Sequence, residues 1–195
     1  MVGDSWTHRL ARVVVKPLVG SPVTPNHLTT LRLATGLAAC AALATGQHRY
    51  EIWGGVLWVL SAFLDRADGE LARLAGTQTR WGHFYDYGCD LAVMTCFFFS
   101  VGFGLRHGVL GTWAVLLGIV SGLSVAAAAL FSEAIERRNG NGEKAYVGAG
   151  GFEFDDILYL FGPFAWLSLL PPLLIGAAVG GPAFAIWTWL RLRRE

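Results

Sequence analysis

Four aspartates stand close together in the sequence, beside long apolar runs where charge should be scarce. Asp65, Asp68, Asp86 and Asp90 all belong to the stretch DRADGELARLAGTQTRWGHFYDYGCD, residues 65–90. A carboxylate withdrawn from water is costly unless a cation compensates it. Ligand sets made only of oxygen select hard cations, and two such ions suit a substrate that carries phosphates. The four aspartates therefore predict a metal site for magnesium or manganese, with two divalent ions.

Small residues accompany the aspartates at helical spacing. On a helix that turns about 100° per residue, one face carries two acids and two small residues, Asp65, Asp68, Gly69 and Ala72. Gly82, Asp86 and Asp90 repeat the arrangement at i, i+4 and i+8 on a second helix. Because a ligand approaches the backbone closely where side chains are small, we expect a slot between the two acid pairs.

Arg73 projects to the side of this acidic face. A guanidinium there is suited to bind a phosphate through two hydrogen bonds, which a lysine does less well. The alternative is an ion-pair ladder along the helix, in which Arg66, Glu70 and Arg73 contact one another at i+4 and i+3 spacing.

The composition indicates where these residues lie. The chain has 195 residues, of which 54% are hydrophobic and 15% charged. This is too apolar for a soluble domain of that length, and we expect one membrane domain, residues 1–195. The net charge of +1 does not favour a nucleic-acid partner.

The apolar segments predict an all-α integral membrane fold with six transmembrane helices, within residues 26–192. The strongly apolar residues 52–64 cover only about 20 Å as a helix, short of the roughly 30 Å hydrocarbon core. This helix must therefore continue through Asp65 to about Arg73. The six expected helices cover residues 28–46, 51–73, 81–104 and 109–131, and two segments from 155 to 191 that Pro171 and Pro172 separate.

The N-terminal residues 6–18 predict a short amphipathic helix on the membrane surface. Trp6, Leu10, Val13 and Val14 recur at helical spacing with basic residues between them. The alternative is a solvated basic tail, because the stretch is short and rich in β-branched residues.

Six spans place both chain termini on one side of the membrane. Of the 15 Lys and Arg residues, all but Arg49 and Arg106 fall in segments on that side. Cytoplasmic segments carry the excess of positive charge, so we expect both termini in the cytoplasm. The second helix ends with two aspartates and the third begins with two, so all four should meet at that cytoplasmic face.

The pattern D-x2-D-G-x2-A-R-x8-G-x3-D-x3-D is met at every fixed position from Asp65 to Asp90. It resembles the signature of the CDP-alcohol phosphotransferase family, the CDP-alcohol phosphatidyltransferases. Residues 25–32, PNHLTTLR, resemble the family's entry to its first membrane helix. The resemblance implies a six-helix membrane enzyme that transfers a substituted phosphate from a CDP-linked donor to an alcohol hydroxyl and releases CMP. It also implies a homodimer.

The resemblance implies roles for individual residues. Asp65, Asp68 and Asp86 should hold a divalent metal that grips the donor diphosphate. Asp90 should complete a second metal position and act as the general base. The pocket for the CDP moiety should be shaped by Gly69, Ala72, Arg73 and Gly82.

The helix entry and the segment 132–156 supply further candidates. Asn26 and Thr29 are expected near the same slot, with capping of the first helix as the alternative. An acceptor pocket is expected from six charged residues, Arg137, Arg138, Lys144, Glu153, Asp155 and Asp156. The bases would suit a phosphorylated alcohol, and the acids a hydroxyl-rich or amine-bearing one. The alternative is that the bases anchor to lipid headgroups and the acids complement a helix N-terminus.

The compact six-helix form resembles enzymes of bacterial phospholipid synthesis, which favours CDP-diacylglycerol as the donor and the bacterial cytoplasmic membrane as the location. Transfer from a soluble CDP-alcohol to a lipid hydroxyl would use the same residues. Two other classes of protein remain as alternatives. An intramembrane prenyltransferase also binds a diphosphate through acidic pairs and magnesium, and a divalent-cation transporter would use the carboxylates as a translocation site.

Overall fold

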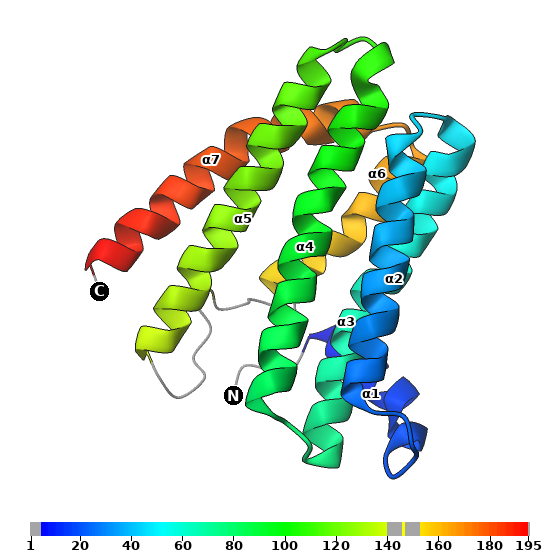
Figure 1. Cartoon of the computed structure of the whole chain (residues 1–195), viewed down its shortest axis with the longest axis vertical. Coiled ribbons are helices and arrows are strands. Elements are labelled where there is room, and N and C mark those ends of the chain that lie inside the picture. Colours follow the sequence, from blue (N-terminus) through cyan, green and yellow to red (C-terminus); the bar gives the residue numbers. More distant parts are fainter. Residues whose placement is uncertain (1–4, 140–145, 147–152, 195) are drawn as a thin grey trace.

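The computed structural model describes residues 5–139, 146 and 153–194, without the side chains of Phe154 and Asp155. Every regular element among these residues is helical, as predicted (Figure 1). The elements are α1 (Trp6–Val15), η1 (Lys16–Leu18), α2 (Pro25–Ala44), α3 (His48–Ala75), α4 (Arg80–Gly104), η2 (Leu105–His107), α5 (Trp113–Asn139), η3 (Phe154–Leu160), α6 (Phe161–Trp166) and α7 (Leu170–Arg194).

The N-terminal helix α1 has the predicted amphipathic character. Its polar face is turned inward, where Thr7 and His8 are buried. Trp6, Leu10 and Val13 are exposed on the opposite face. An apolar face turned outward suits contact with lipid better than contact with water.

Helices α2, α3 and α4 bring the aspartates together. Helix α3 continues without a break past the apolar segment to Ala75. This agrees with the prediction that the apolar segment alone is too short to cross the hydrocarbon core. It ends at Gly76, which has the left-handed φ of 63° that favours glycine. Thr79 then caps α4 by accepting a hydrogen bond of 3.0 Å from the backbone N–H of Gly82. This short connection places the end of α3 beside the start of α4.

In the C-terminal half, the helices begin and end at other residues than the sequence predicted. Helix α5 begins at Trp113 and extends to Asn139, beyond the expected end at residue 131. The last apolar region breaks at residues 167–169, and Pro171 and Pro172 lie in the first turn of α7. Proline is tolerated there because first-turn N–H groups have no partner within the helix.

An aromatic cluster joins the two halves. The ring centres of Trp58 on α3 and Phe97 on α4 lie 4.2 Å apart, and those of Phe97 and Phe161 on α6 lie 4.9 Å apart. The indole N–H of Trp58 also donates to the backbone oxygen of Leu158 at 2.9 Å. Segment η3–α6 is therefore held against α3 and α4, which fixes one wall of the region beside the aspartates.

Helices α4 and α5 approach each other closely. A Cβ atom added at Gly102 would lie 2.9 Å from the Cα atom of Gly118, and one added at Gly118 would lie 2.6 Å from the backbone oxygen of Phe98. Only glycine fits at both positions, as is common where membrane helices pack.

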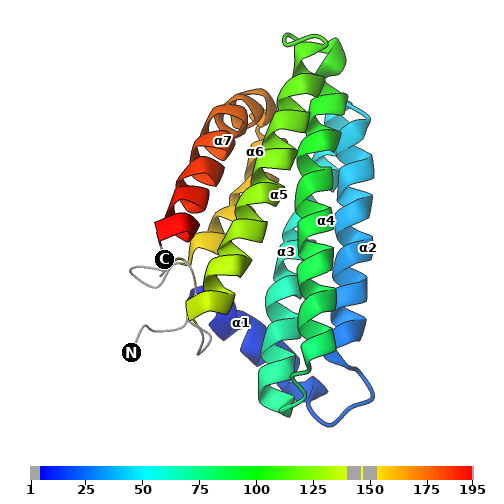
Figure 2. The ribbon, with the colours of Figure 1, turned by 60° about the vertical axis from the view of Figure 1, so that its left-hand side comes forward.

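Four helices of the described chain are long and apolar enough to cross a membrane. They cover Pro25–Ala44, Arg80–His107, Trp113–Asn139 and Leu170–Arg194. The protein is therefore a multi-pass membrane protein by its helix composition. Figures 1 and 2 show α1 near the end of the bundle that holds the α3–α4 connection, and α7 runs toward that end, whereas the α2–α3 and α4–α5 connections lie at the other end.

Candidate active site

Three of the four aspartates form a compact group. Asp65 and Asp68 on α3 and Asp86 on α4 each offer a carboxylate oxygen, and these oxygens lie within 4.8 Å of one another. Asp68 is the most enclosed, with 3% of its surface exposed. We call these three residues the acidic cluster. The convergence predicted from the helix order is therefore present.

The fourth aspartate, Asp90, contacts an arginine that sequence reasoning did not single out. Arg32 on α2 is 97% buried, and its Nη2 lies 2.6 Å from Oδ1 of Asp90. Its Nη1 lies 2.7 Å from Asp65 and 2.8 Å from Asp86. A lone cation inside an apolar helix is itself a signal that an anionic partner is near.

The charges at this site favour divalent cations. Four carboxylates face one guanidinium, so most of the negative charge remains uncompensated by Arg32. The donors within the acidic cluster are all carboxylate oxygens, which are the ligands that Mg²⁺ and Mn²⁺ prefer. The residues present therefore fit a divalent metal.

A cavity of about 860 Å³ lies on one side of the acidic cluster. We call it the α2–α3 cavity. Its lining includes all six residues for which a role in binding the CDP moiety was predicted, Asn26, Thr29, Gly69, Ala72, Arg73 and Gly82. Asp68 and Asp86 line it as well. Residues from the start of the first membrane helix and from the aspartate stretch thus surround a single space.

Two side chains from the start of α2, Asn26 and Thr29, line this cavity. Thr29 donates a hydrogen bond of 2.7 Å to Oδ2 of Asp68, which fixes that carboxylate. A Cβ atom added at Gly82 would lie 3.4 Å from Oδ1 of Asn26 and 3.0 Å from Oγ1 of Thr79. The absence of a side chain at Gly82 therefore keeps space open beside Asn26.

Arg73 lines the α2–α3 cavity and also forms an ion pair. Its Nη2 lies 2.6 Å from Oε1 of Glu70, as the ladder alternative predicted. Glu70 is buried and accepts a further hydrogen bond of 2.9 Å from Nε of Arg12 on α1. Arg66 contacts a distant residue instead of following the predicted ladder, because its Nη1 lies 3.4 Å from Oε2 of Glu153 at the start of η3. Half of the Arg73 side chain stays exposed, so the pair leaves it accessible from the cavity.

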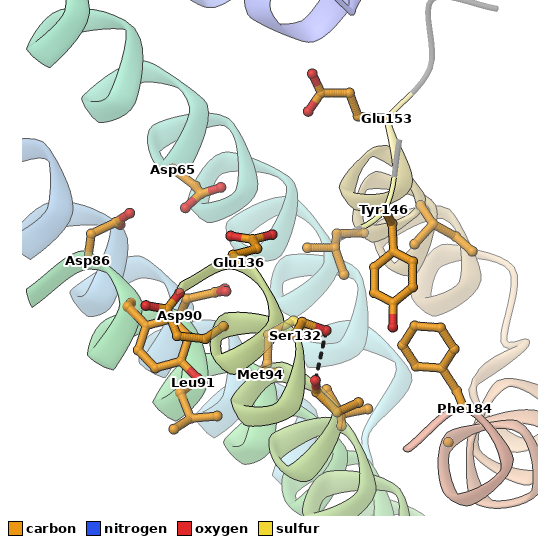
Figure 3. Close-up of a pocket in the computed structure, with 18 of the residues that line it drawn as sticks. Asp65, Asp86, Asp90, Leu91, Met94, Ser132, Glu136, Tyr146, Glu153 and Phe184 are labelled. Carbon is orange, nitrogen blue, oxygen red and sulfur yellow. Dashed lines mark hydrogen bonds between the residues drawn. The ribbon is translucent and has the colours of Figure 1, made fainter. Parts of the chain in front are cut away.

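A second cavity, of about 450 Å³, lies on the other side of the acidic cluster. We call it the α4–α5 cavity. Asp65 and Asp90 line it, and it shares His83 and Asp86 with the α2–α3 cavity. Figure 3 shows the carboxylates of Asp65, Asp86 and Asp90 on one side of this space and the rings of Tyr146 and Phe184 on the other.

The residues predicted for an acceptor pocket do not all face this cavity. Glu153 lines it. Asp156 is buried and accepts a hydrogen bond of 2.7 Å from Oγ1 of Thr7 on α1. Arg137 pairs with Glu133 at 2.8 Å, and Arg138 donates to the backbone oxygen of Leu192 at 2.8 Å. Lys144 and the Asp155 side chain lie outside the described part of the structure.

Sequence reasoning placed Glu133 at the cytoplasmic approach but missed two other residues that border the α4–α5 cavity. Glu136 on α5 and Tyr146 line it together with Glu133. Both glutamates lie beyond residue 131, where hydropathy placed the end of the helix. Their i, i+3 spacing on a continued helix is the signal that would have placed them on one face.

The fold and the site together define a multi-pass membrane protein whose acidic, metal-suited centre lies between two cavities. Residues 22–187 match the CDP-alcohol phosphatidyltransferase family. The chain belongs to this family, as its aspartate pattern predicted.

Curated relatives show the same likeness over parts of the chain. A phosphatidylinositol phosphate synthase of Corynebacterium glutamicum is 37% identical over 84 residues, which are 41% of this chain and 37% of that protein. An archaetidylinositol phosphate synthase of Pyrococcus horikoshii is 33% identical over 100 residues, 51% of this chain and 50% of that protein. The chain thus matches half or less of the length of these relatives.

A solved structure shares the fold. The crystal structure of the Mycobacterium tuberculosis phosphatidylinositol phosphate synthase with CDP-DAG bound superposes with a TM-score of 0.65. The match covers 95% of this chain and 91% of that one, at 19% sequence identity. At this identity the comparison supports the arrangement of the helices.

Proposed function

We propose that the protein transfers a phosphatidyl group from CDP-diacylglycerol to the hydroxyl of an alcohol and releases CMP. The observation that carries the proposal is that two cavities meet at Asp86 of the acidic cluster. A transfer reaction requires two substrates to approach one phosphorus atom from different sides. The α2–α3 cavity is assigned to the CDP moiety and the α4–α5 cavity to the acceptor.

The α2–α3 cavity has the groups that a nucleotide diphosphate requires. Asn26 offers an amide for hydrogen bonding, and Arg73 offers a guanidinium suited to a phosphate. Gly82 lines the cavity without a side chain, and the guanidinium of Arg73 lies 3.6 Å from where a Cβ atom at Gly69 would be, so these glycines leave room for Arg73 and for a ligand. The pairing of Arg73 with Glu70 holds the guanidinium at the wall of the cavity without neutralising the acidic cluster.

The acidic cluster would hold the divalent ions, with Asp90 completing a second position. When bound, such ions offset the charge of the phosphate oxygens and of the departing CMP. The hydrogen bond from Thr29 to Asp68 fixes one carboxylate. Arg32, one turn further along α2, pairs with Asp65 and Asp86, so these three carboxylates are oriented before any ligand arrives.

Asp90 is assigned as the general base. It lines the α4–α5 cavity, where the acceptor hydroxyl would lie, and does not line the α2–α3 cavity. Its ion pair with Arg32 holds the carboxylate in place beside that cavity. The acceptor oxygen forms a bond to the phosphorus that carries diacylglycerol, the bond from that phosphorus to CMP breaks, and the hydroxyl proton passes to Asp90.

The membrane arrangement follows from the same proposal. Six crossings are assigned to α2, α3, α4, α5, η3–α6 and α7, within one domain of residues 1–195. The termini and the acidic cluster then face the cytoplasm, and α1 lies in the interface. A CDP-diacylglycerol molecule can keep its tails in the bilayer while its head reaches the cluster. The resemblance to the family also leads us to propose a homodimer.

The test is to give the purified protein CDP-diacylglycerol, magnesium and a pool of candidate alcohols. We expect CMP release together with a new phospholipid identified by mass. A parallel reaction with soluble CDP-alcohols and diacylglycerol tests the opposite polarity. Product formation only in that second reaction would overturn the donor assignment, and no CMP release in either would overturn the proposed activity.

A further inference from the structure

Helix α1 turns a polar face toward the interior of the protein. The buried side chains of this face include Thr7 and His8. The helix packs against α3, near the end of the bundle that holds the α3–α4 connection (Figure 2). Buried polar groups are costly unless they are paired, so the partners of these side chains show which groups α1 holds in place.

Two side chains of α1 hold both oxygens of a buried carboxylate on α3. Glu70 has only 2% of its surface exposed. Nδ1 of His8 lies 2.9 Å from Oε1 of Glu70, and Nε of Arg12 donates a hydrogen bond of 2.9 Å to Oε2. His8 and Arg12 lie one helical turn apart on α1 and therefore share a face. The Glu70 carboxylate is thus fixed at both oxygens from α1.

The same carboxylate holds Arg73 in the wall of the α2–α3 cavity. Nη2 of Arg73 lies 2.6 Å from Oε1 of Glu70 and 3.2 Å from Nδ1 of His8. An isolated i, i+3 ion pair of a half-exposed arginine stabilises little, because holding two long side chains in one geometry costs entropy. Glu70 has already lost its freedom to α1, so it can hold the guanidinium at a lower cost.

The His8 ring is also held from its other side. Its Nε2 lies 3.3 Å from Oε2 of Glu153 and 3.3 Å from Nη1 of Arg66. The neighbouring Thr7 donates a hydrogen bond to Asp156 on η3, which ties α1 to that segment as well. A ring that is contacted at both nitrogens is fixed in orientation, as a residue that positions another side chain must be.

We propose that His8 is a positioning residue for the donor, which holds Glu70 and Arg73 so that the guanidinium faces the diphosphate in the α2–α3 cavity. Helix α1 is then a part of the donor site as well as a membrane contact. This inference rests on the proposed function, because it concerns the donor of that reaction. A purely structural His8 would join α1 to the bundle without a specific effect on the donor.

Two conservative substitutions distinguish the two ring nitrogens. The side-chain amide of asparagine can take the place of Nδ1, whereas that of glutamine can take the place of Nε2. His8→Asn should therefore keep the contact with Glu70, and His8→Gln should lose it. The measurement is the Kd of labelled CDP-diacylglycerol for the full-length protein in detergent, with magnesium and without an alcohol. We expect His8→Gln to raise this Kd by at least about fivefold and His8→Asn to change it by less than about twofold.

A substitution beside His8 controls for loosening of α1. Thr7→Val removes the hydrogen bond to Asp156 and keeps the shape of the side chain. It should lower the midpoint of thermal unfolding and leave the Kd of CDP-diacylglycerol unchanged, because Thr7 contacts neither Glu70 nor Arg73 among the printed hydrogen-bond distances of the described chain.

A double-mutant cycle then tests whether His8 acts through Arg73. In an Arg73→Gln background, His8→Gln should cause no further rise in Kd, because the guanidinium that it positions is gone. The inference is overturned by an unchanged Kd in His8→Gln, by an equal rise in His8→Asn or Thr7→Val, or by an equal rise with and without Arg73. In each of these cases the proposed function stands. Absence of CDP-diacylglycerol binding by the unaltered protein would overturn both.

Discussion

Arg32 on α2 and Asp90 on α4 form an ion pair of 2.6 Å, and the same guanidinium reaches Asp65 on α3. A single side chain therefore ties the first three long helices together at the proposed reaction centre. Because Arg32 is almost fully buried, its charge acts on these carboxylates with little screening by water. The arginine thus joins three helices and also orients the carboxylates that we propose for catalysis.

Replacing Arg32 should destabilise the protein. Arg32→Gln leaves buried carboxylates without their cation, which costs about 3–5 kcal/mol of unfolding free energy when one partner of a buried pair is lost. The measurement is the midpoint of thermal unfolding in detergent, in the presence of a chelator. Arg106→Gln is the control, because Arg106 contacts the backbone oxygen of Phe103 in an exposed setting at the other end of the bundle. Equal midpoints for the two variants would contradict the role given to Arg32.

Replacing Asp68 should abolish turnover while preserving the fold. Asp68→Asn keeps the shape of the side chain but removes a charged oxygen from the acidic cluster, and CMP release should fall by at least about 100-fold at every magnesium concentration. The matched control is Glu51→Gln, which changes a buried acid near the opposite end of the same helix. Near-normal turnover of Asp68→Asn would remove Asp68 from the metal site.

Filling the α2–α3 cavity should weaken donor binding. Gly82→Leu places a side chain beside Asn26 and Thr79, so the KM for CDP-diacylglycerol should rise by at least about tenfold. Gly88→Leu introduces the same side chain on α4 at a position with no atom within 4 Å, and its KM should stay near that of the unaltered protein. Similar KM values for both variants would show that the CDP moiety binds elsewhere.

Much of the site could be predicted from the sequence because many of its residues lie close together along the chain. Asp65, Asp68, Gly69 and Ala72 lie within three turns of one helix, so helical periodicity alone placed them on one face. The short connection after Gly76 then fixed which end of the next helix lies beside them. The membrane thickness required α3 to extend past its apolar part, and it does.

The rest depends on contacts between distant segments. Arg32 meets partners that are 33 to 58 residues away, and Asp156 meets Thr7 across 149 positions. No periodicity within one helix encodes such pairs, which follow from how the helices are packed. The boundary of α5 was misplaced for a different reason: hydropathy marks the edge of the apolar segment, whereas the helix continues through Glu133 and Glu136.

The proposed transfer of the phosphatidyl group requires divalent cations bound at the acidic cluster. The most direct measurement is CMP release from CDP-diacylglycerol by the purified protein after chelation, followed by titration with magnesium or manganese. Chelation should eliminate turnover, either ion should restore it, and Asp68→Asn should not be restored by any concentration of either. Turnover that persists at full rate in the chelator would show that the acidic cluster needs no divalent cation for the reaction.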